Sequence, residues 1–283
     1  DLYIERGVRR VSAAAYMSLT PAIVRYAYSG IHIDEHGNVQ RPNMVFAKIS
    51  RPEVARHFVH PAPEAMLTAL VSKGQLTAAE AALAASLPVA EDITIESDSG
   101  GHTDNRPLAP LFATIQAVRD EAVAQHRYTR PVRLGAAGGI GTPQAAAAAF
   151  ALGASYVLTG TINEACVESG LSDEGKQMLA AADIADIAMA PAADMFEMGV
   201  ELQVLKRGTM FAPRAKKLYS LYTTYPSLDA IPDTERIEVE QKILGATFGE
   251  CWETTKAFWN DREPAQVVKA EQNPRHKMAL TFR

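Results

Sequence analysis

Five short runs of β-branched and small apolar residues alternate with helical stretches in the first part of the chain, and this order limits the fold more than any other feature. A strand–helix–strand–helix order is typical of a parallel sheet. Strands this short and apolar fit a barrel interior and a buried open sheet equally well. The runs are Val8–Ala14, Met44–Ile49, Asp92–Glu96, Val132–Ala136 and Ser155–Thr159.

Helical periodicity fills the segments between these runs and dominates from Asn163 onward, where strand signals disappear. Thr77, with Glu80 three residues later, predicts a capping box at the start of one helix. Residues 31–41 predict a small exposed hairpin outside the core. We therefore expect an α/β part over residues 1–162 and a helical part over residues 163–283. The predicted helices are Pro21–Tyr28, Pro63–Val71, Ala78–Leu87, Pro107–His126, Pro143–Leu152, Glu174–Asp183, Pro213–Tyr222, Pro232–Leu244 and Glu250–Trp259.

Composition and charge exclude several classes of protein. The 283 residues carry 28 Lys and Arg against 33 Asp and Glu, a formal charge of −5, so no global basic surface for nucleic acid is expected. The longest nearly apolar run, Ala145–Ala154, is about half of a membrane span. Cys166 and Cys251 cannot form a disulfide framework, which favours a reducing, cytoplasmic location. No metal-ligand spacing is present, so no metal site is expected.

Two small turns, each directly after a predicted strand, form the first candidate site. Residues 138–141, Gly-Gly-Ile-Gly, precede a helix, so their backbone amides can bind an anion near the start of that helix. Residues 159–161, Thr-Gly-Thr, follow the next strand. Turns of this kind after consecutive strands form the phosphate site of a (β/α)8 barrel. The alternative is that these glycines only make tight turns.

A polar loop after the strand Asp92–Glu96 provides a candidate catalytic group. Two glycines precede His102 and leave space for a flat ligand, and a histidine at a strand's carboxyl end can donate a proton near neutral pH. Asp98 and Asp104 are close enough in sequence to orient it. The alternative is a polar loop with a capping histidine.

Basic residues supply two further candidate binding sites. Lys48 lies in an apolar strand, where it can hold an anion at the strand's end or guard an edge strand against aggregation. A local basic cluster can meet a phosphate or an acidic protein, or can be a solvated helix face. The cluster consists of Lys206, Arg207, Arg214, Lys216 and Lys217.

Three long strings resemble a known group of flavoenzymes. ESDSGGHTDNRP (96–107) and GAAGGIGTPQAAAAAFALGASYVLTGTIN (135–163) resemble the nitronate monooxygenase superfamily of FMN-dependent barrels. DIAMAPAADMFEMGVELQVLKRGTMFAPRAKKLYSLY (186–222) is similar to the PfaD-type trans-acting enoyl reductases of polyunsaturated fatty acid and polyketide synthases. The resemblance runs across essentially the whole chain.

This resemblance implies an α/β fold, a (β/α)8 TIM barrel with FMN at the carboxyl ends of its strands. It also implies reduction of an enoyl thioester on an acyl carrier protein, with NAD(P)H as electron donor and His102 as the proton donor. Lys48, Ser99, Gly100 and Gly101 would lie beside the flavin. The residues that would hold its phosphate are Gly138, Gly139, Ile140, Gly160 and Thr161.

The resemblance also shapes what is expected beyond the site. The five predicted strands would be the last five of eight, and the first three would precede Asp1 in the natural protein. Two other functions stay open: a flavin monooxygenase that oxidises nitronates, and a non-catalytic scaffold component of a synthase complex. Whether the chain forms a homo-oligomer also stays open.

Overall fold

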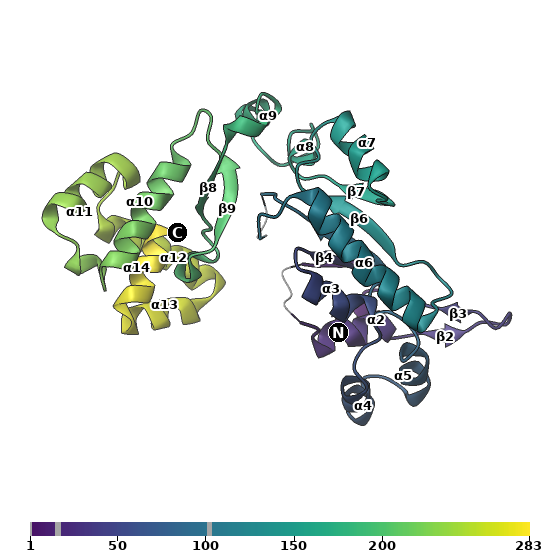
Figure 1. Cartoon of the computed structure of the whole chain (residues 1–283). Coiled ribbons are helices and arrows are strands. Elements are labelled where there is room, and N and C mark those ends of the chain that lie inside the picture. The colour runs from purple at the N-terminus through teal and green to yellow at the C-terminus, as the bar shows by residue number, and fades with distance from the viewer. Residues whose placement is uncertain (1, 15–17, 101–103) are drawn as a thin grey trace. The chain divides into compact units, whose positions relative to one another are not determined.

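The computed structural model describes residues 2–14, 18–100 and 104–283, and contacts divide them into two compact units (Figure 1). Unit 1 contains the described residues up to Ser99 and those from Asp104 to Ser169. Unit 2 contains Gly100 and Gly170–Arg283.

Unit 1 is built on a parallel sheet of five strands in the order β1-β4-β5-β6-β7. All five predicted strands are confirmed, with ends that differ by at most a few residues. Their bounds are β1 Arg10–Ala13, β4 Met44–Ile49, β5 Asp92–Glu96, β6 Arg133–Ala137 and β7 Tyr156–Leu158.

The predicted (β/α)8 TIM barrel is wrong for the described residues, because this sheet is open. Strands β1 and β7 lie at its two edges, and neither pairs with the other within the part of the chain that the structure describes. Closing a barrel requires every strand to be paired on both sides, and five strands with ordinary twist do not return to the first.

Successive side chains of a strand point to opposite faces of the sheet, and helices cover the face of β4 that carries its buried side chains. On β4, Val45, Ala47 and Ile49 are buried, whereas Phe46 and Lys48 on the opposite face are only half-buried. Helices α3 and α6 pack on β4 and β5 and against each other. The helices of unit 1 are α1 Leu2–Glu5, α2 Pro21–Tyr28, α3 Pro52–Val59, α4 Glu64–Ser72, α5 Ala78–Ala84, α6 Leu108–His126, α7 Pro143–Ala151 and α8 Thr161–Glu164.

Local sequence signals predict several of these boundaries well. The Thr77–Glu80 capping box is present at the start of α5, with the threonine hydroxyl accepting from the backbone amide of Glu80. The antiparallel pair β2 (His32–Ile33) and β3 (Val39–Gln40) confirms the predicted hairpin, and Gly37 has the positive φ of 80° that its turn requires. Helix α3, which begins with Pro52, is absent from the prediction.

A buried arginine, Arg41, directly follows this hairpin. The segment 31–41 therefore does not lie wholly outside the core, contrary to the prediction. Arg41 is only 8% exposed, and its guanidinium donates hydrogen bonds to the carbonyl oxygens of Ala27 (3.0 Å), Pro88 (2.7 Å) and Val89. It also lies 5.1 Å from the ring centroid of Tyr28. Burial lowers the pKa of Arg41 and raises the pKa of the Tyr28 hydroxyl to about 12. Arg41 thus joins three separate segments of unit 1.

Unit 2 contains a hairpin that the sequence pattern does not predict. Strands β8 (Ile187–Pro191) and β9 (Glu201–Leu205) pair antiparallel, with Ile187 opposite Leu205. The expectation of a purely helical region over 163–283 is therefore wrong. Alanine and methionine occupy most of β8, so neither β-branched enrichment nor strict alternation marks it as a strand.

The helices of unit 2 enclose an aromatic core of their own. Phe196, Tyr222, Phe248 and Phe282 are buried in it. The prediction lacks two helices of this unit, although each begins with the N-terminal proline that favours a helix start. The elements are α9 Asp173–Ala180, η1 Ile184–Asp186, η2 Phe196–Met198, α10 Phe211–Thr224, η3 Leu228–Ala230, α11 Asp233–Val239, the π-helical η4 Glu240–Leu244, α12 Phe248–Arg262, α13 Pro264–Gln272 and α14 Pro274–Phe282.

Candidate functional site

The candidate site lies at the carboxyl edge of the unit 1 sheet. Because β4, β5, β6 and β7 are parallel neighbours, the turns that follow them meet at one edge. Ala137 of β6 is in register with Glu96 of β5 and with Leu158 of β7. The structure therefore places the loops after Glu96, Ala137 and Leu158 side by side, as the sequence analysis expected for a ligand site.

Lys48 forms an ion pair at this edge. Its Nζ lies 2.9 Å from Oε1 of Glu96, and the two side chains are 25% and 12% exposed. Strand β4 lies between β1 and β5, so the alternative of a lysine that guards an edge strand is wrong. The ion pair fixes a cation on the half-buried face of the sheet, beside the loop that follows β5. Glu96 was not predicted as the partner of Lys48.

Ser97, which the sequence analysis passed over, joins two of the loops. It is 2% exposed, and both its amide (2.9 Å) and its hydroxyl (2.8 Å) donate to the carbonyl oxygen of Ala137. A Cβ at Gly138 would lie 2.5 Å from Oγ of Ser97 and 2.7 Å from the carbonyl oxygen of Asp98. A serine placed directly after a buried strand is the signal that could have indicated this contact.

The glycine turn after β6 has the features of an anion cradle. Gly138 and Gly139 have positive φ values of 95° and 69°. The backbone amides of Gly139, Ile140 and Gly141 make no hydrogen bond to any residue that the structure describes. A Cβ at Gly139 or Gly141 would meet nothing within 4 Å. Thr142 then caps α7 by accepting from the amide of Ala145. These residues fit a phosphate-sized group.

The turn after β7 is simpler. Gly160 caps the short helix α8, and a Cβ at this position would meet nothing within 4 Å. Its φ is −112°, so its backbone conformation does not require glycine. The hydroxyl of Thr159 donates a 3.1 Å hydrogen bond to Oδ1 of Asn163. Thr161 is the first residue of α8.

The loop after β5 is described only in part. His102, the predicted catalytic residue, and Gly101 lie outside the described residues. Gly100 is exposed, and Oγ of Ser99 lies 3.5 Å from Oε1 of Glu96, the oxygen that also pairs with Lys48. The roles predicted for these four loop residues stay predictions, as do those of Lys48, the two glycine turns, FMN and NAD(P)H.

Asp104, predicted from sequence to orient His102, has its carboxylate bound to Arg51 and Ser50. Its carboxylate accepts two 2.7 Å hydrogen bonds from Arg51 and one of 2.9 Å from Ser50. The Arg51 guanidinium, with the Ser50 hydroxyl, holds the pKa of Asp104 below its ordinary value. Asp104 therefore ties the loop after β5 to the start of α3.

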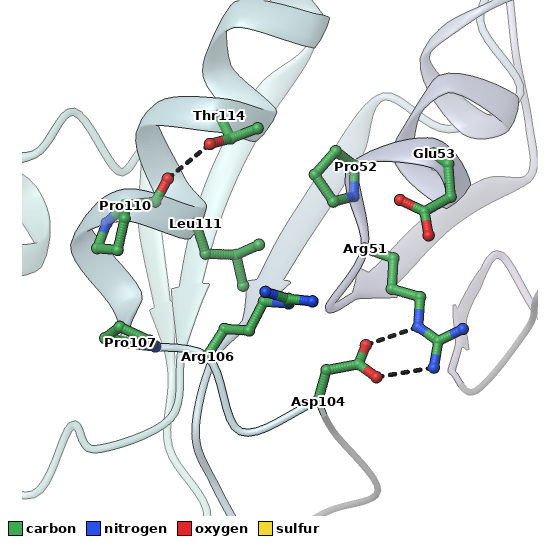
Figure 2. A pocket seen from close by; sticks show the side chains of 9 residues that line it. All are labelled: Arg51, Pro52, Glu53, Asp104, Arg106, Pro107, Pro110, Leu111 and Thr114. Carbon is green, nitrogen blue, oxygen red and sulfur yellow. Dashed lines mark hydrogen bonds and ion pairs between the residues drawn. The ribbon is translucent and has the colours of Figure 1, made fainter.

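A cavity of about 620 Å³ opens beside this ion pair (Figure 2). Figure 2 shows the Arg106 guanidinium directed into the space between the start of α3 and the start of α6. Arg106 is exposed, and its side chain makes no hydrogen bond or ion pair within the described residues. The lining is completed by Arg51, Pro52, Glu53, Asp104, Pro107, Pro110, Leu111 and Thr114. Neither arginine of this cavity stands out by residue type or spacing in the sequence.

The sequence predicts neither a metal site nor a membrane-spanning helix. No group of three or more His, Cys, Asp or Glu side chains that could hold a metal ion occurs among the described residues. No helix among them is both long and apolar enough to span a membrane.

Comparisons with known proteins connect the chain to carrier-protein-dependent biosynthesis. The family model of the inserted helical domain of [acyl-carrier-protein] S-malonyltransferase matches residues 225–283. All of the chain aligns with one of the polyunsaturated fatty acid synthase subunits of Thraustochytrium sp. at 46% identity, and with the polyketide biosynthesis protein PksE of Bacillus subtilis at 44%. The chain covers only 19% and 36% of those two proteins.

A solved structure is similar over almost the whole chain. It is the enoyl reductase domain of MlnA from the macrolactin biosynthesis cluster of Bacillus amyloliquefaciens, with 39% sequence identity and a TM-score of 0.90. The match covers 99% of this chain and 62% of that one.

These findings correct the predicted family, function and enzyme class. The matching family model describes a helical domain of a malonyltransferase, not a flavin enzyme. The curated relatives are polyketide biosynthesis proteins and polyunsaturated fatty acid synthase subunits, and their names give no flavin oxidoreductase. The assignment to an NAD(P)H-dependent FMN enoyl reductase is therefore not kept, and neither is the nitronate monooxygenase alternative. The setting in polyketide and fatty acid biosynthesis is supported.

Proposed function

We propose that the chain is the part of a polyketide or polyunsaturated fatty acid synthase protein that binds an acyl group held as a thioester on an acyl carrier protein. One observation carries this proposal: 98–100% of the chain aligns at 43–46% identity with segments of four such proteins. The chain spans 14–36% of those relatives, so the reactions of the whole proteins are not assigned to it.

The names of the similar proteins differ in reaction but agree in substrate chemistry. The family model is named for transfer of a malonyl group to a carrier protein, and the MlnA domain is named for enoyl reduction. In biosynthesis on carrier proteins, both reactions act on an acyl thioester. The function is therefore proposed at the level of this shared substrate.

The carboxyl edge of unit 1 is the proposed ligand site. The backbone amides of Gly139, Ile140 and Gly141 would donate to phosphate oxygens, helped by the N-terminus of α7. Lys48, which is paired with Glu96, would lie at the same edge of the sheet on β4, which β5 separates from β6. FMN carries a phosphate monoester, and the phosphopantetheine arm of a carrier protein carries a phosphodiester. Both present anionic phosphate oxygens, so this chemistry fits either ligand.

The proposed function is tested by incubating the full polypeptide with carrier proteins that bear a series of acyl groups. We expect saturable binding, and a change in the mass of the carrier-bound acyl group that identifies the reaction without assuming it. Mass spectrometry of the intact carrier protein and titration calorimetry provide the two measurements. If the polypeptide neither binds nor alters any acyl-carrier protein in the series, the proposed function is wrong.

The phosphate site has a sharper test, because Gly141 has an ordinary φ and a Cβ there would meet nothing within 4 Å. Gly141→Asp should leave the fold intact but place a carboxylate in the cradle, and like-charge repulsion should weaken binding of a phosphate monoester about tenfold or more. Gly141→Asn is the matched neutral control. Titration with FMN and with coenzyme A separates the two sources, and equal affinities of the two variants for both ligands would contradict the site.

A further inference from the structure

Four large apolar side chains are exposed on three linked segments of unit 2. Ile184 is 86% exposed and Ile187 is 39% exposed, at and just after η1. Met210 and Phe211, at the start of α10, are 59% and 50% exposed. Single exposed apolar residues need no explanation, but a contiguous group of them marks an interaction surface.

Hydrogen bonds link the segments that carry these residues. Ile187 pairs with Leu205 across the hairpin, and the amide of Lys206 donates to the carbonyl oxygen of Asp186 at 2.7 Å. The amide of Phe211 then donates to the hydroxyl of Thr209 at 3.2 Å. The end of the hairpin, η1 and the start of α10 are therefore linked through a few residues.

Cations are concentrated in the segment that carries Met210 and Phe211, although the chain as a whole is acidic. Residues 202–228 contain five Lys and Arg and no Asp or Glu, in a chain with a formal charge of −5. Two of the five, Arg207 and Lys217, are neutralised by Asp186 and Glu235. The side chains of the other three are exposed and make no hydrogen bond or ion pair with any described residue; they are Lys206, Arg214 and Lys216.

We propose that this surface docks the acidic carrier protein that presents the acyl thioester, an inference that rests on the proposed function. We call it the docking surface and define it by Ile184, Ile187, Lys206, Met210, Phe211 and Arg214. An apolar centre with a cationic rim complements a partner that has apolar residues within an acidic rim. The charge complementarity selects an acidic protein, and the net acidity of the chain argues against nucleic acid as the occupant.

The docking surface is tested with a paired charge reversal in the full polypeptide. Lys206→Glu with Arg214→Glu should weaken binding of the carrier protein about tenfold or more, mainly by slowing association, because the charges lie on the rim. Lys73→Glu with Lys269→Glu is the matched control, since both lysines are exposed and make no ion pair with a described residue. Surface plasmon resonance at low and high salt gives the rate constants, and the wild-type affinity should fall with salt.

The apolar centre has its own variant, Phe211→Ser. It should increase the dissociation rate and leave the salt dependence unchanged, because Phe211 contributes area rather than charge. Circular dichroism checks that each variant is folded.

The possible results separate the two proposals. Wild-type binding that the paired reversal weakens, with the control unchanged, supports the docking surface. If the wild type binds and neither the paired reversal nor Phe211→Ser changes that binding, the docking surface is wrong but the proposed function stands. The same result is expected if another part of the polypeptide covers this surface. Equal weakening by the paired reversal and the control shows a general charge effect, which overturns it as well. No wild-type binding to any carrier protein contradicts the proposed function, and the docking surface with it.

Discussion

Arg41→Met should destabilise unit 1 by at least about 3 kcal/mol, since methionine keeps an unbranched apolar stem but donates no hydrogen bond. Three carbonyl oxygens from two segments, that of Ala27 and those of the adjacent Pro88 and Val89, would lose a charged donor. Each would be left in an interior where water does not replace the lost bond, because Arg41 is 8% exposed. The contact with the ring of Tyr28 would also lose its cation.

Urea denaturation followed by circular dichroism measures this effect. Arg56→Met is the matched control, because the Arg56 ion pair with Glu121 is exposed on both sides and should contribute less than about 1 kcal/mol. Arg41→Lys keeps the charge but cannot reach three carbonyls at once, so its stability should fall between those of the wild type and Arg41→Met. Equal stabilities of the Arg41→Met and Arg56→Met variants would show that the buried arginine does not join these segments.

Gly138→Ala should cost about 2–5 kcal/mol and deform the candidate site, for two reasons that add. The φ of 95° is a conformation that residues with a Cβ rarely adopt. The new methyl group would also lie 2.7 Å from the carbonyl oxygen of Asp98, and a backbone atom cannot move aside as a side chain can. The loop after β5 would be pushed away from the turn after β6.

Gly141→Ala, in the same turn, is the control for this substitution. Its φ is ordinary and its Cβ would meet nothing within 4 Å, so its stability should stay within about 0.5 kcal/mol of the wild type. Thermal and urea denaturation provide the stabilities. If Gly138→Ala were as stable as Gly141→Ala, the close approach of the two loops in the structure would be wrong.

Short-range sequence signals account for most of unit 1. The five strands are marked by apolar runs, and α5, α6 and α7 are marked by a capping threonine or a proline near the first turn. These signals work because they report local interactions that a few neighbouring residues complete. The same logic fails for β8, whose strand conformation depends on pairing with β9 across an intervening loop.

The sequence likewise indicates only those parts of the candidate site that residue type marks locally. The glycine turn after β6 and the lysine of β4 stand out in the sequence by residue type. Glu96 as the ion-pair partner of Lys48, and Ser97 as the link to Ala137, follow from the register between parallel strands. Sequence spacing does not give that register, because the partners lie 48 and 40 residues apart (Lys48 to Glu96, Ser97 to Ala137).

The sequence by itself determined that unit 1 alternates strands and helices in a parallel α/β arrangement, since hydrophobic period and capping residues are local properties of the chain. Only the tertiary structure decided that the sheet is open, that Arg41 is buried, and that the hairpin end and α10 share a basic and apolar surface. These features depend on which distant segments pack together. The free energy of such packing comes from burial and hydrogen bonding between partners that no local pattern specifies.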